Sequence, residues 1–321
     1  MSEAFSILKI IFGIVAVIWG ADLLTKGACA LARRMKVSEM LIGLTIVAFG
    51  TSMPEFVISI LSAMEGSADI AVGNIVGSNI FNTLCIVGIT AIVCPITILR
   101  TTVKRDIPFS IGASILLLVL CMDSFGLNIE GSTLSRFDGI ILLLFFAVFF
   151  YIVIRNRKTG ESTEKTDDNA PQVTALWKMI LFIIIGLAML IGGGEVMVSG
   201  AKSIAQALGI SESVIGLTVV ACGTSLPELA TSVVAARKGS SELAIGNVLG
   251  SNVFNILWIL GATSLISPLH IQGISVVDMG TMLLGVFLMW LFCFTKYKVQ
   301  RWEGIVMFSI YLAYMIYLIH S

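Results

Sequence analysis

The stretch GLTIVAFGTSMPE, from Gly43 to Glu55, recurs as GLTVVACGTSLPE, from Gly216 to Glu228. A second stretch, GNIVGSNIFN from Gly73 to Asn82, recurs as GNVLGSNVFN from Gly246 to Asn255. Both pairs are separated by 173 residues, so no insertion divides the two motifs within either copy. Two long patterns that recur in order at one offset indicate an internal duplication. The chain is therefore expected to consist of two related halves.

The composition places the chain in a membrane. Of its 321 residues 57% are hydrophobic and only 12% are charged, and the mean hydropathy is +1.00. Soluble domains carry about 25% charged residues, and a compact soluble fold of this length could not bury so much apolar surface. Twenty acidic residues balance twenty basic ones, and the lack of a basic block excludes nucleic acid as a partner. The sequence predicts an integral membrane protein surrounded by lipid.

Ten apolar segments are long enough, at about 20 residues, to cross a bilayer as helices. We expect an all-α membrane protein with transmembrane helices at approximately 5–32, 38–64, 70–96, 106–122, 137–155, 174–205, 211–235, 243–268, 275–295 and 302–319. Residues 156–173 are strongly polar and are predicted to form a flexible cytoplasmic linker. This linker separates a first five-helix repeat, residues 1–155, from a second, residues 174–321.

The basic residues support this segmentation. Sixteen of the 20 Lys and Arg residues follow the odd-numbered segments and therefore lie on one side of the membrane. They are Arg33, Arg34, Lys36, Arg100, Lys104, Arg105, Arg155, Arg157, Lys158, Lys165, Lys178, Arg237, Lys238, Lys296, Lys298 and Arg301. By the positive-inside rule that side is cytoplasmic, which places both termini outside. The bare loops favour a prokaryote-like plasma membrane, the inner membrane of the cell.

An odd number of helices in each half has a topological consequence. The two halves must enter the membrane from opposite sides, which predicts inverted repeats with a binding site between them near the midplane. In each half a proline, Pro54 or Pro227, precedes a glutamate within a span and removes one helical hydrogen bond. Broken helices are tolerated in membranes where the freed backbone lines a cavity or binds an ion. We therefore expect two helices broken at the midplane.

Glu55 and Glu228 are the leading candidates for ion binding, because a carboxylate within a span is costly and normally marks a site or pathway. The preceding Thr and Ser share a helical face with each glutamate, and the next span carries Asn and Ser every four residues. The other predicted ligands are Thr51, Ser52, Ser78, Asn82, Thr224, Ser225, Ser251 and Asn255. Two carboxylates with amide and hydroxyl oxygens suit a hard cation, and Ca²⁺ best.

Several other polar residues have two interpretations. Asn74 and Asn247 fit either the site or an interhelical hydrogen bond, whereas Ser59 and Ser232 are expected to be structural and to bond the backbone of their own helices. The repeat-related acids Asp22 and Glu195 would line an ion path or pair with Lys26 and Lys202. The six cysteines form no CxxC pair, which is typical of buried apolar side chains rather than of a zinc site.

The two motif pairs resemble the alpha repeats of the calcium/cation antiporter superfamily, especially those of sodium/calcium exchangers. The resemblance implies a five-plus-five helix fold and electrogenic exchange of sodium for calcium by alternating access. It implies that the first and sixth helices slide past the rest of the molecule to switch access. It also implies that the ten residues named above are the ion ligands. Proton/calcium exchangers of the superfamily typically carry Gly-Asn-Ala-x-Glu where this chain has Thr-Ser-x-Pro-Glu, which favours sodium. Potassium-dependent members and some prokaryotic exchangers have Asp where Asn255 stands.

A sodium/calcium antiporter is accordingly the predicted function, with Ca²⁺ and Na⁺ as transported ions and no cofactor or obligate protein partner. The alternative in the same class is an antiporter that couples Ca²⁺, or another divalent cation, to protons through the same two glutamates. An intramembrane enzyme is disfavoured because the chain lacks a Ser/His or Cys/His pair, an HExxH motif and an aspartate-rich diphosphate site. A passive channel would pass Ca²⁺ without a counter-ion gradient.

Overall fold

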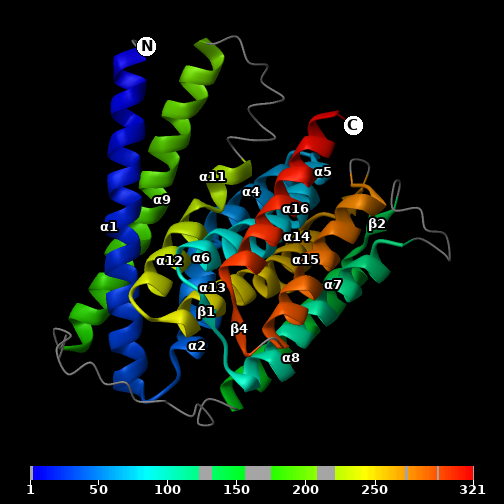
Figure 1. Cartoon of the computed structure of the whole chain (residues 1–321). Coiled ribbons are helices and arrows are strands. Elements are labelled where there is room, and N and C mark those ends of the chain that lie inside the picture. The colour runs from blue at the N-terminus through cyan, green and yellow to red at the C-terminus, as the bar shows by residue number, and fades with distance from the viewer. Residues whose placement is uncertain are drawn as a thin grey trace.

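The computed structural model of the chain describes residues 3–122, 132–155, 175–207, 221–271, 274–294 and 296–320 (Figure 1). These ranges are helical apart from turns and four strands of two residues each. The predicted linker, 156–173, and residues 211–220 of the predicted seventh span lie outside the described residues.

In the first half, a long helix is followed by helices that are interrupted by π-helical segments, here labelled η. The elements are α1 Glu3–Met35, α2 Glu39–Ile42, η1 Gly43–Val47, α3 Ala48–Thr51, α4 Met53–Met64, α5 Ala68–Ile80, η2 Phe81–Ile86, α6 Val87–Val93, β1 Ile96–Thr97, η3 Thr102–Asp106, α7 Ile107–Leu120, β2 Thr133–Leu134 and α8 Arg136–Arg155.

The second half follows the same order in its described part. The elements are α9 Leu176–Ala207, α11 Ala221–Thr224, α12 Leu226–Arg237, α13 Ser241–Val253, η5 Phe254–Leu260, α14 Gly261–Ile266, β3 Leu269–His270, α15 Val276–Phe294, β4 Lys298–Val299 and α16 Arg301–His320. Helical residues therefore occur in each of the ten predicted ranges, as far as those ranges are described.

Length and apolar composition identify fewer membrane spans than the ten predicted. In the described residues, six helices are long and apolar enough to cross a membrane, and the bent pair at Glu39–Thr51 and Met53–Met64 would make a seventh. Large apolar side chains are exposed on the outer helices, among them Phe12 on α1, Phe137 on α8 and Trp177 on α9. An apolar exterior of this kind suits lipid as the surrounding solvent, and the structure is that of a membrane protein. The count of ten remains a prediction.

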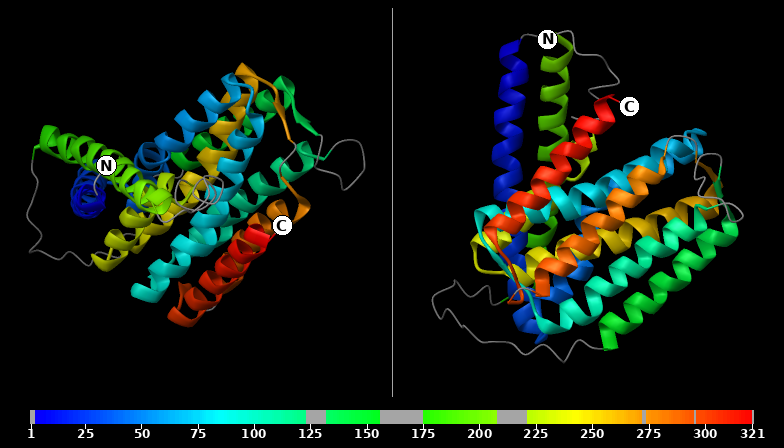
Figure 2. Two further views of the ribbon diagram at one scale, coloured as in Figure 1. Left: turned by 90° about the horizontal axis from the view of Figure 1, so that it is seen from above. Right: turned by 45° about the vertical axis from the view of Figure 1, so that its right-hand side comes forward.

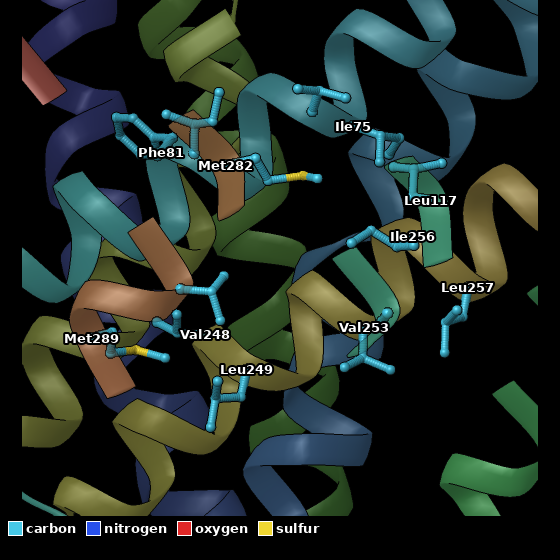
Figure 3. Close-up of a cluster of buried hydrophobic side chains, with 14 of the residues drawn as sticks. Ile75, Phe81, Leu117, Val248, Leu249, Val253, Ile256, Leu257, Met282 and Met289 are labelled. Atoms are coloured by element: carbon cyan, nitrogen blue, oxygen red, sulfur yellow. The ribbon is translucent and has the colours of Figure 1, made fainter. Parts of the chain in front are cut away.

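Two spans form the centre of the molecule. In Ala68–Val93 and Ser241–Ile266, 83% and 94% of the most apolar window is buried, against 22–39% in the other four long apolar helices of the described residues. Their apolar side chains pack with those of α7 and α15 in one cluster, in which Ile75, Val248, Ile256 and Met282 lie (Figure 3). The centre of the fold is therefore made by the repeat-related helices that carry the GSNxxN motifs.

The two longest helices, α1 and α9, lie side by side at one edge of the bundle (Figure 2). They run antiparallel, because Gly13 of α1 meets Gly193 of α9, and Gly20 meets Gly186. A Cβ atom at Gly20 would lie 2.8 Å from the carbonyl oxygen of Gly186, so only glycine permits this approach. Apolar side chains of both helices, among them Leu24 of α1 and Leu190 of α9, pack in a second cluster apart from that of the central helices.

Two short antiparallel strand pairs join the halves. Strand β1, which follows α6, pairs with β4, which precedes α16. Strand β3, which follows α14, pairs with β2, which precedes α8. Each pair thus connects the end of a central span in one half to the start of the last helix in the other half.

Candidate ion-binding site

The first broken helix is interrupted at Ser52, between α3 and α4. Ser52 has φ −83° and ψ 8°, outside the helical region, and the two parts of the span are bent by 45°. Ser225 interrupts the second between α11 and α12 with φ −92° and ψ 9°. A proline lies in the first turn after each break, where its missing N–H costs nothing. The breaks fall where the prolines predict them, one residue beyond Thr51 and Thr224.

Both glutamates lie in the first turn of the helix after the break and are buried, with 1% of each residue exposed. Each carboxylate accepts a hydrogen bond from the serine of the opposite half. Ser52 Oγ donates to Glu228 Oε1 at 3.1 Å, and Ser225 Oγ donates to Glu55 Oε1 at 3.0 Å. The two breaks therefore face each other and bring both glutamates into one buried site.

The central helices supply the next predicted ligands. Ser225 Oγ also lies 3.2 Å from Ser78 Oγ on α5, and Ser251 Oγ on α13 donates to Glu228 Oε1 at 3.4 Å. Thr51 is buried, and its Oγ1 lies 3.1 Å from both Asn247 Oδ1 and the carbonyl oxygen of Val47, either of which can accept its hydrogen. Its counterpart Thr224 is half-buried at the end of α11.

Asn82 and Asn255 lie in the π-helical segments η2 and η5, which the sequence did not predict. A π-turn widens the helix by one residue and is frequent at functional sites. Both residues are buried, with 1% exposed. The widened turns interrupt the regular i, i+4 stripe that the sequence predicted for the polar residues of these spans.

Four oxygens in this region are buried and have no hydrogen-bond partner among the described residues: Glu55 Oε2, Glu228 Oε2, Asn82 Oδ1 and Asn255 Oδ1. An unpaired buried oxygen is costly, and a buried carboxylate more so. Oxygens of carboxylates, amides and hydroxyls are the ligands that Ca²⁺ and other hard cations prefer. The described residues include no group of three or more His, Cys, Asp or Glu that could hold a metal ion. The oxygens gathered here come instead from two carboxylates, from hydroxyls and from amides. The site fits a cation.

The structure favours an interhelical role for the two asparagines that have two interpretations from the sequence. Asn74 Nδ2 donates to the carbonyl oxygen of Glu55 at 3.3 Å, and Asn247 Nδ2 donates to that of Glu228 at 3.3 Å. The same amides donate to the hydroxyls of Ser59 and Ser232, each at 3.2 Å. These bonds hold the broken helices against the central ones. Both serines were expected to bond the backbone of their own helices, but Ser59 Oγ donates to the carbonyl oxygen of Ala71 on α5 and Ser232 Oγ donates to that of Ala244 on α13. The two serines therefore also join neighbouring helices.

Asp22 forms ion pairs within the described residues. Lys26 Nζ lies 2.7 Å from one carboxylate oxygen, and Lys238, at the end of α12, contacts the other. The pairing with Lys26 was one of the two predicted alternatives, but the contact with Lys238 was not predicted. The repeat-related Glu195 is exposed on α9.

Two residues of the site were not predicted from the sequence. Asn79 and Asn252, the asparagines of the two Gly-Ser-Asn triplets, are buried and contact Asn255 and Asn82, respectively. The available signal was their recurrence within the matched motifs at the same offset as the predicted ligands. Helical spacing did not place them on the predicted polar stripe.

A bundle of apolar helices that encloses a buried pair of carboxylates is typical of membrane proteins that move ions. Comparison with known proteins identifies the family. The chain matches the family described as sodium/calcium exchanger protein over residues 5–155 and 178–320. The chain therefore belongs to the sodium/calcium exchanger family, a family of transporters and not of enzymes.

Relatives and solved structures agree with this assignment. The putative antiporter CaxA of Alkalimonas amylolytica is 37% identical, over 97% of this chain and 98% of that protein. The sodium/calcium exchanger MaX1 of Methanosarcina acetivorans is 32% identical, over 98% of each. A structure of the sodium-calcium exchanger NCX_Mj soaked with zero Na⁺ and Ca²⁺ is similar with a TM-score of 0.84 and 32% identity, over 99% of this chain and 100% of that one.

Proposed function

We propose that this chain exchanges Ca²⁺ for Na⁺ across the membrane by alternating access, with Glu55 and Glu228 at the centre of the transport site. The observation that carries the proposal is the buried pair of carboxylates, each with one oxygen hydrogen-bonded to the opposite half and the other unpaired among the described residues. The further ligands that we propose are Thr51, Ser52, Ser78, Asn82, Thr224, Ser225, Ser251 and Asn255.

Charge compensation provides the coupling. One Ca²⁺ neutralises both glutamates, and Na⁺ ions neutralise them by occupying the same carboxylates and the neighbouring hydroxyl and amide oxygens. An uncompensated pair of carboxylates in a closed, dry site is costly. The protein therefore switches sides readily only when cations are bound, which enforces exchange. Na⁺ entering down its gradient then drives Ca²⁺ out of the cytoplasm.

The fold that we propose for this mechanism has ten helices in two inverted halves, residues 1–155 and 174–321, joined by a cytoplasmic linker. Reciprocal contacts support it. A serine of each half bonds the glutamate of the other half, and each of the two strand pairs takes one strand from each half. The antiparallel packing of α1 and α9, the first helix of each half, supports it as well. The basic residues support a plasma-membrane orientation with both termini outside.

Sodium is the proposed coupling ion rather than the proton. Each broken helix carries Thr-Ser-x-Pro-Glu, and the relative MaX1 and the structure NCX_Mj are both named sodium/calcium exchangers. Uptake of ⁴⁵Ca²⁺ into proteoliposomes, driven in turn by an outward sodium gradient and by a pH gradient without sodium, separates the two. We expect uptake only with the sodium gradient, whereas a pH-driven signal would support proton coupling.

Substitution of either glutamate tests the site. Glu55→Gln and Glu228→Gln should each lower Na⁺-driven ⁴⁵Ca²⁺ flux by roughly 100-fold or more, because losing one partner of a buried charge interaction costs about 3–5 kcal/mol. Glu65→Gln is the matched control, since Glu65 is exposed at the end of α4 and should transport normally. Normal flux in both single variants of the buried glutamates would refute the assignment.

A further inference from the structure

The two GSNxxN motifs contain four buried asparagines, which form hydrogen bonds between the halves. Two of them, Asn82 and Asn255, are proposed ligands, and each is paired with an asparagine of the other half. Asn255 Nδ2 donates to Asn79 Oδ1 at 3.0 Å, and Asn82 Nδ2 donates to Asn252 Oδ1 at 3.1 Å. In both pairs, the residue predicted as a ligand is the donor. Its own Oδ1 has no partner among the described residues.

The chemistry of the amide makes this arrangement directional. A primary amide carries an oxygen that only accepts and an NH₂ group that only donates, and the two lie in one plane on opposite sides of the Cβ–Cγ bond. Once its NH₂ group is held by an acceptor, the oxygen must face the other way. An amide turned by 180° would present hydrogens to a cation, which needs an oxygen. We propose that Asn79 and Asn252 are positioning residues that keep the amide oxygens of Asn255 and Asn82 turned toward the transported cations.

A backbone group sets the direction of one pair. Asn79 Nδ2 donates to the carbonyl oxygen of Asn252 at 3.3 Å. Because a backbone carbonyl only accepts, Asn79 must turn its NH₂ group to it and its oxygen toward Asn255. Asn255 must then donate, which frees its own oxygen. The backbone carbonyl of Asn252 thus fixes the orientation of the Asn79 amide, and Asn79 in turn fixes the orientation of the Asn255 amide.

The other pair lacks this anchor. Asn252 Nδ2 is buried and has no hydrogen-bond partner among the described residues. No backbone carbonyl of the described residues therefore orients the Asn252 amide. The Asn252–Asn82 pair is therefore held less firmly than the Asn79–Asn255 pair. Loss of Asn79 should consequently impair the site more than loss of Asn252, although the two positions are equivalent in the repeat.

A carboxylate at position 255 would remove the need for orientation. It presents an oxygen whichever way it turns, and in the native arrangement one of its oxygens would face Asn79 Oδ1, which is also an acceptor. The proposal therefore predicts an interaction between the two positions. Asn79→Leu should impair the native chain and should be neutral or beneficial when combined with Asn255→Asp.

A double-mutant cycle tests this prediction. The native chain, Asn79→Leu, Asn255→Asp and the double variant are compared by the Ca²⁺ dependence of Na⁺-driven flux and by equilibrium ⁴⁵Ca²⁺ binding to purified protein. Asn79→Leu should raise the apparent KM for Ca²⁺ and weaken binding by roughly 10-fold or more, as is usual when a partner that orients a metal ligand is lost. Ile80→Ala, a change at the adjacent buried position of the same helix, controls for lost packing and should leave the KM unchanged.

Two results would overturn the inference: an unchanged KM in Asn79→Leu, or the same loss from this substitution with and without Asn255→Asp. If Asn79→Leu is not recovered folded, Asn79→Ala serves in the same cycle. The inference rests on the proposed function, so Glu55→Gln is measured in the same assay. If that variant retains Ca²⁺ binding, the transport site itself is wrong; if it loses binding while the cycle is additive, only the positioning role is wrong.

Discussion

Ser225 and Ser232 lie two turns apart on the second broken helix, yet their contacts differ. Ser225 Oγ bonds the Glu55 carboxylate and Ser78, whereas Ser232 Oγ bonds the Ala244 carbonyl and accepts from Asn247. A hydrogen bond to a charged group contributes about 1.5–3 kcal/mol, more than a bond between neutral groups. At the scale of single residues, contact with a carboxylate therefore distinguishes Ser225, a proposed ligand, from Ser232, which contacts only neutral groups.

This contrast gives a matched pair of substitutions. Ser225→Ala should weaken Ca²⁺ binding by roughly 10-fold or more, because the lost bond to a charged group exceeds the 1.4 kcal/mol that corresponds to one decade. Ser232→Ala removes a hydroxyl of the same size from the same helix and should change binding little. Equilibrium ⁴⁵Ca²⁺ binding measures both variants. Equal losses of affinity in the two would mean that the bond between Ser225 and the Glu55 carboxylate does not contribute to Ca²⁺ binding.

At the scale of elements, α1 is tied to the turn between α12 and α13. Lys238 contacts Asp22 of α1, and Cys29 Sγ of α1 lies 3.3 Å from Ser240 Oγ in that turn. The α1–α9 pair itself packs closely through glycines and through a shared cluster of apolar side chains. These two polar contacts join α1 to the turn in this structure.

A reversible cross-link tests whether α1 moves during transport. Ser240→Cys places a thiol beside that of Cys29, and oxidation should join α1 to the turn. If α1 slides relative to the central helices, the oxidised variant should lose Na⁺-driven ⁴⁵Ca²⁺ flux, and a reductant should restore it. The unsubstituted chain, oxidised in the same way, is the control. Full flux in a protein shown by peptide mapping to be cross-linked would exclude sliding of α1 against this turn.

At the scale of the whole molecule, the two halves depend on each other. Each glutamate is bonded by a serine of the other half, and each strand pair takes one strand from each half. Neither half holds a complete set of these contacts. The proposed inverted arrangement accounts for this exchange, and it also requires the linker and the C-terminus to lie on opposite sides of the membrane.

Labelling of introduced cysteines tests this topology. In intact cells a membrane-impermeant thiol reagent should react with Ser321→Cys and should leave Ser162→Cys, in the linker, unmodified. In inside-out vesicles the pattern should reverse. The unsubstituted chain gives the background from its own cysteines. Labelling of both positions from the same side would rule out an odd number of spans in the second half and with it the inverted repeat.

The sequence by itself determined the membrane environment, the duplication, the family and the location of the helix breaks. These follow from local rules. An apolar segment must be helical in lipid, a proline removes a helical hydrogen bond, and a carboxylate within a membrane span is costly and normally marks a site or pathway. Glu55 and Glu228 could therefore be predicted as site residues by these rules alone. The helical period also predicted that Thr51 and Ser52 share a face with Glu55.

Only the tertiary structure decided which oxygens are bonded and which are left unpaired. Ser52 bonds Glu228 rather than Glu55, and Asn79 bonds Asn255. In both cases the two partners are 176 residues apart in the sequence. Helical periodicity describes neighbours within one segment and carries no information about such contacts. The widened turns η2 and η5 also depart from the regular helical period on which the sequence prediction relied. The orientation of the amides could therefore not be read from the motifs in which they lie.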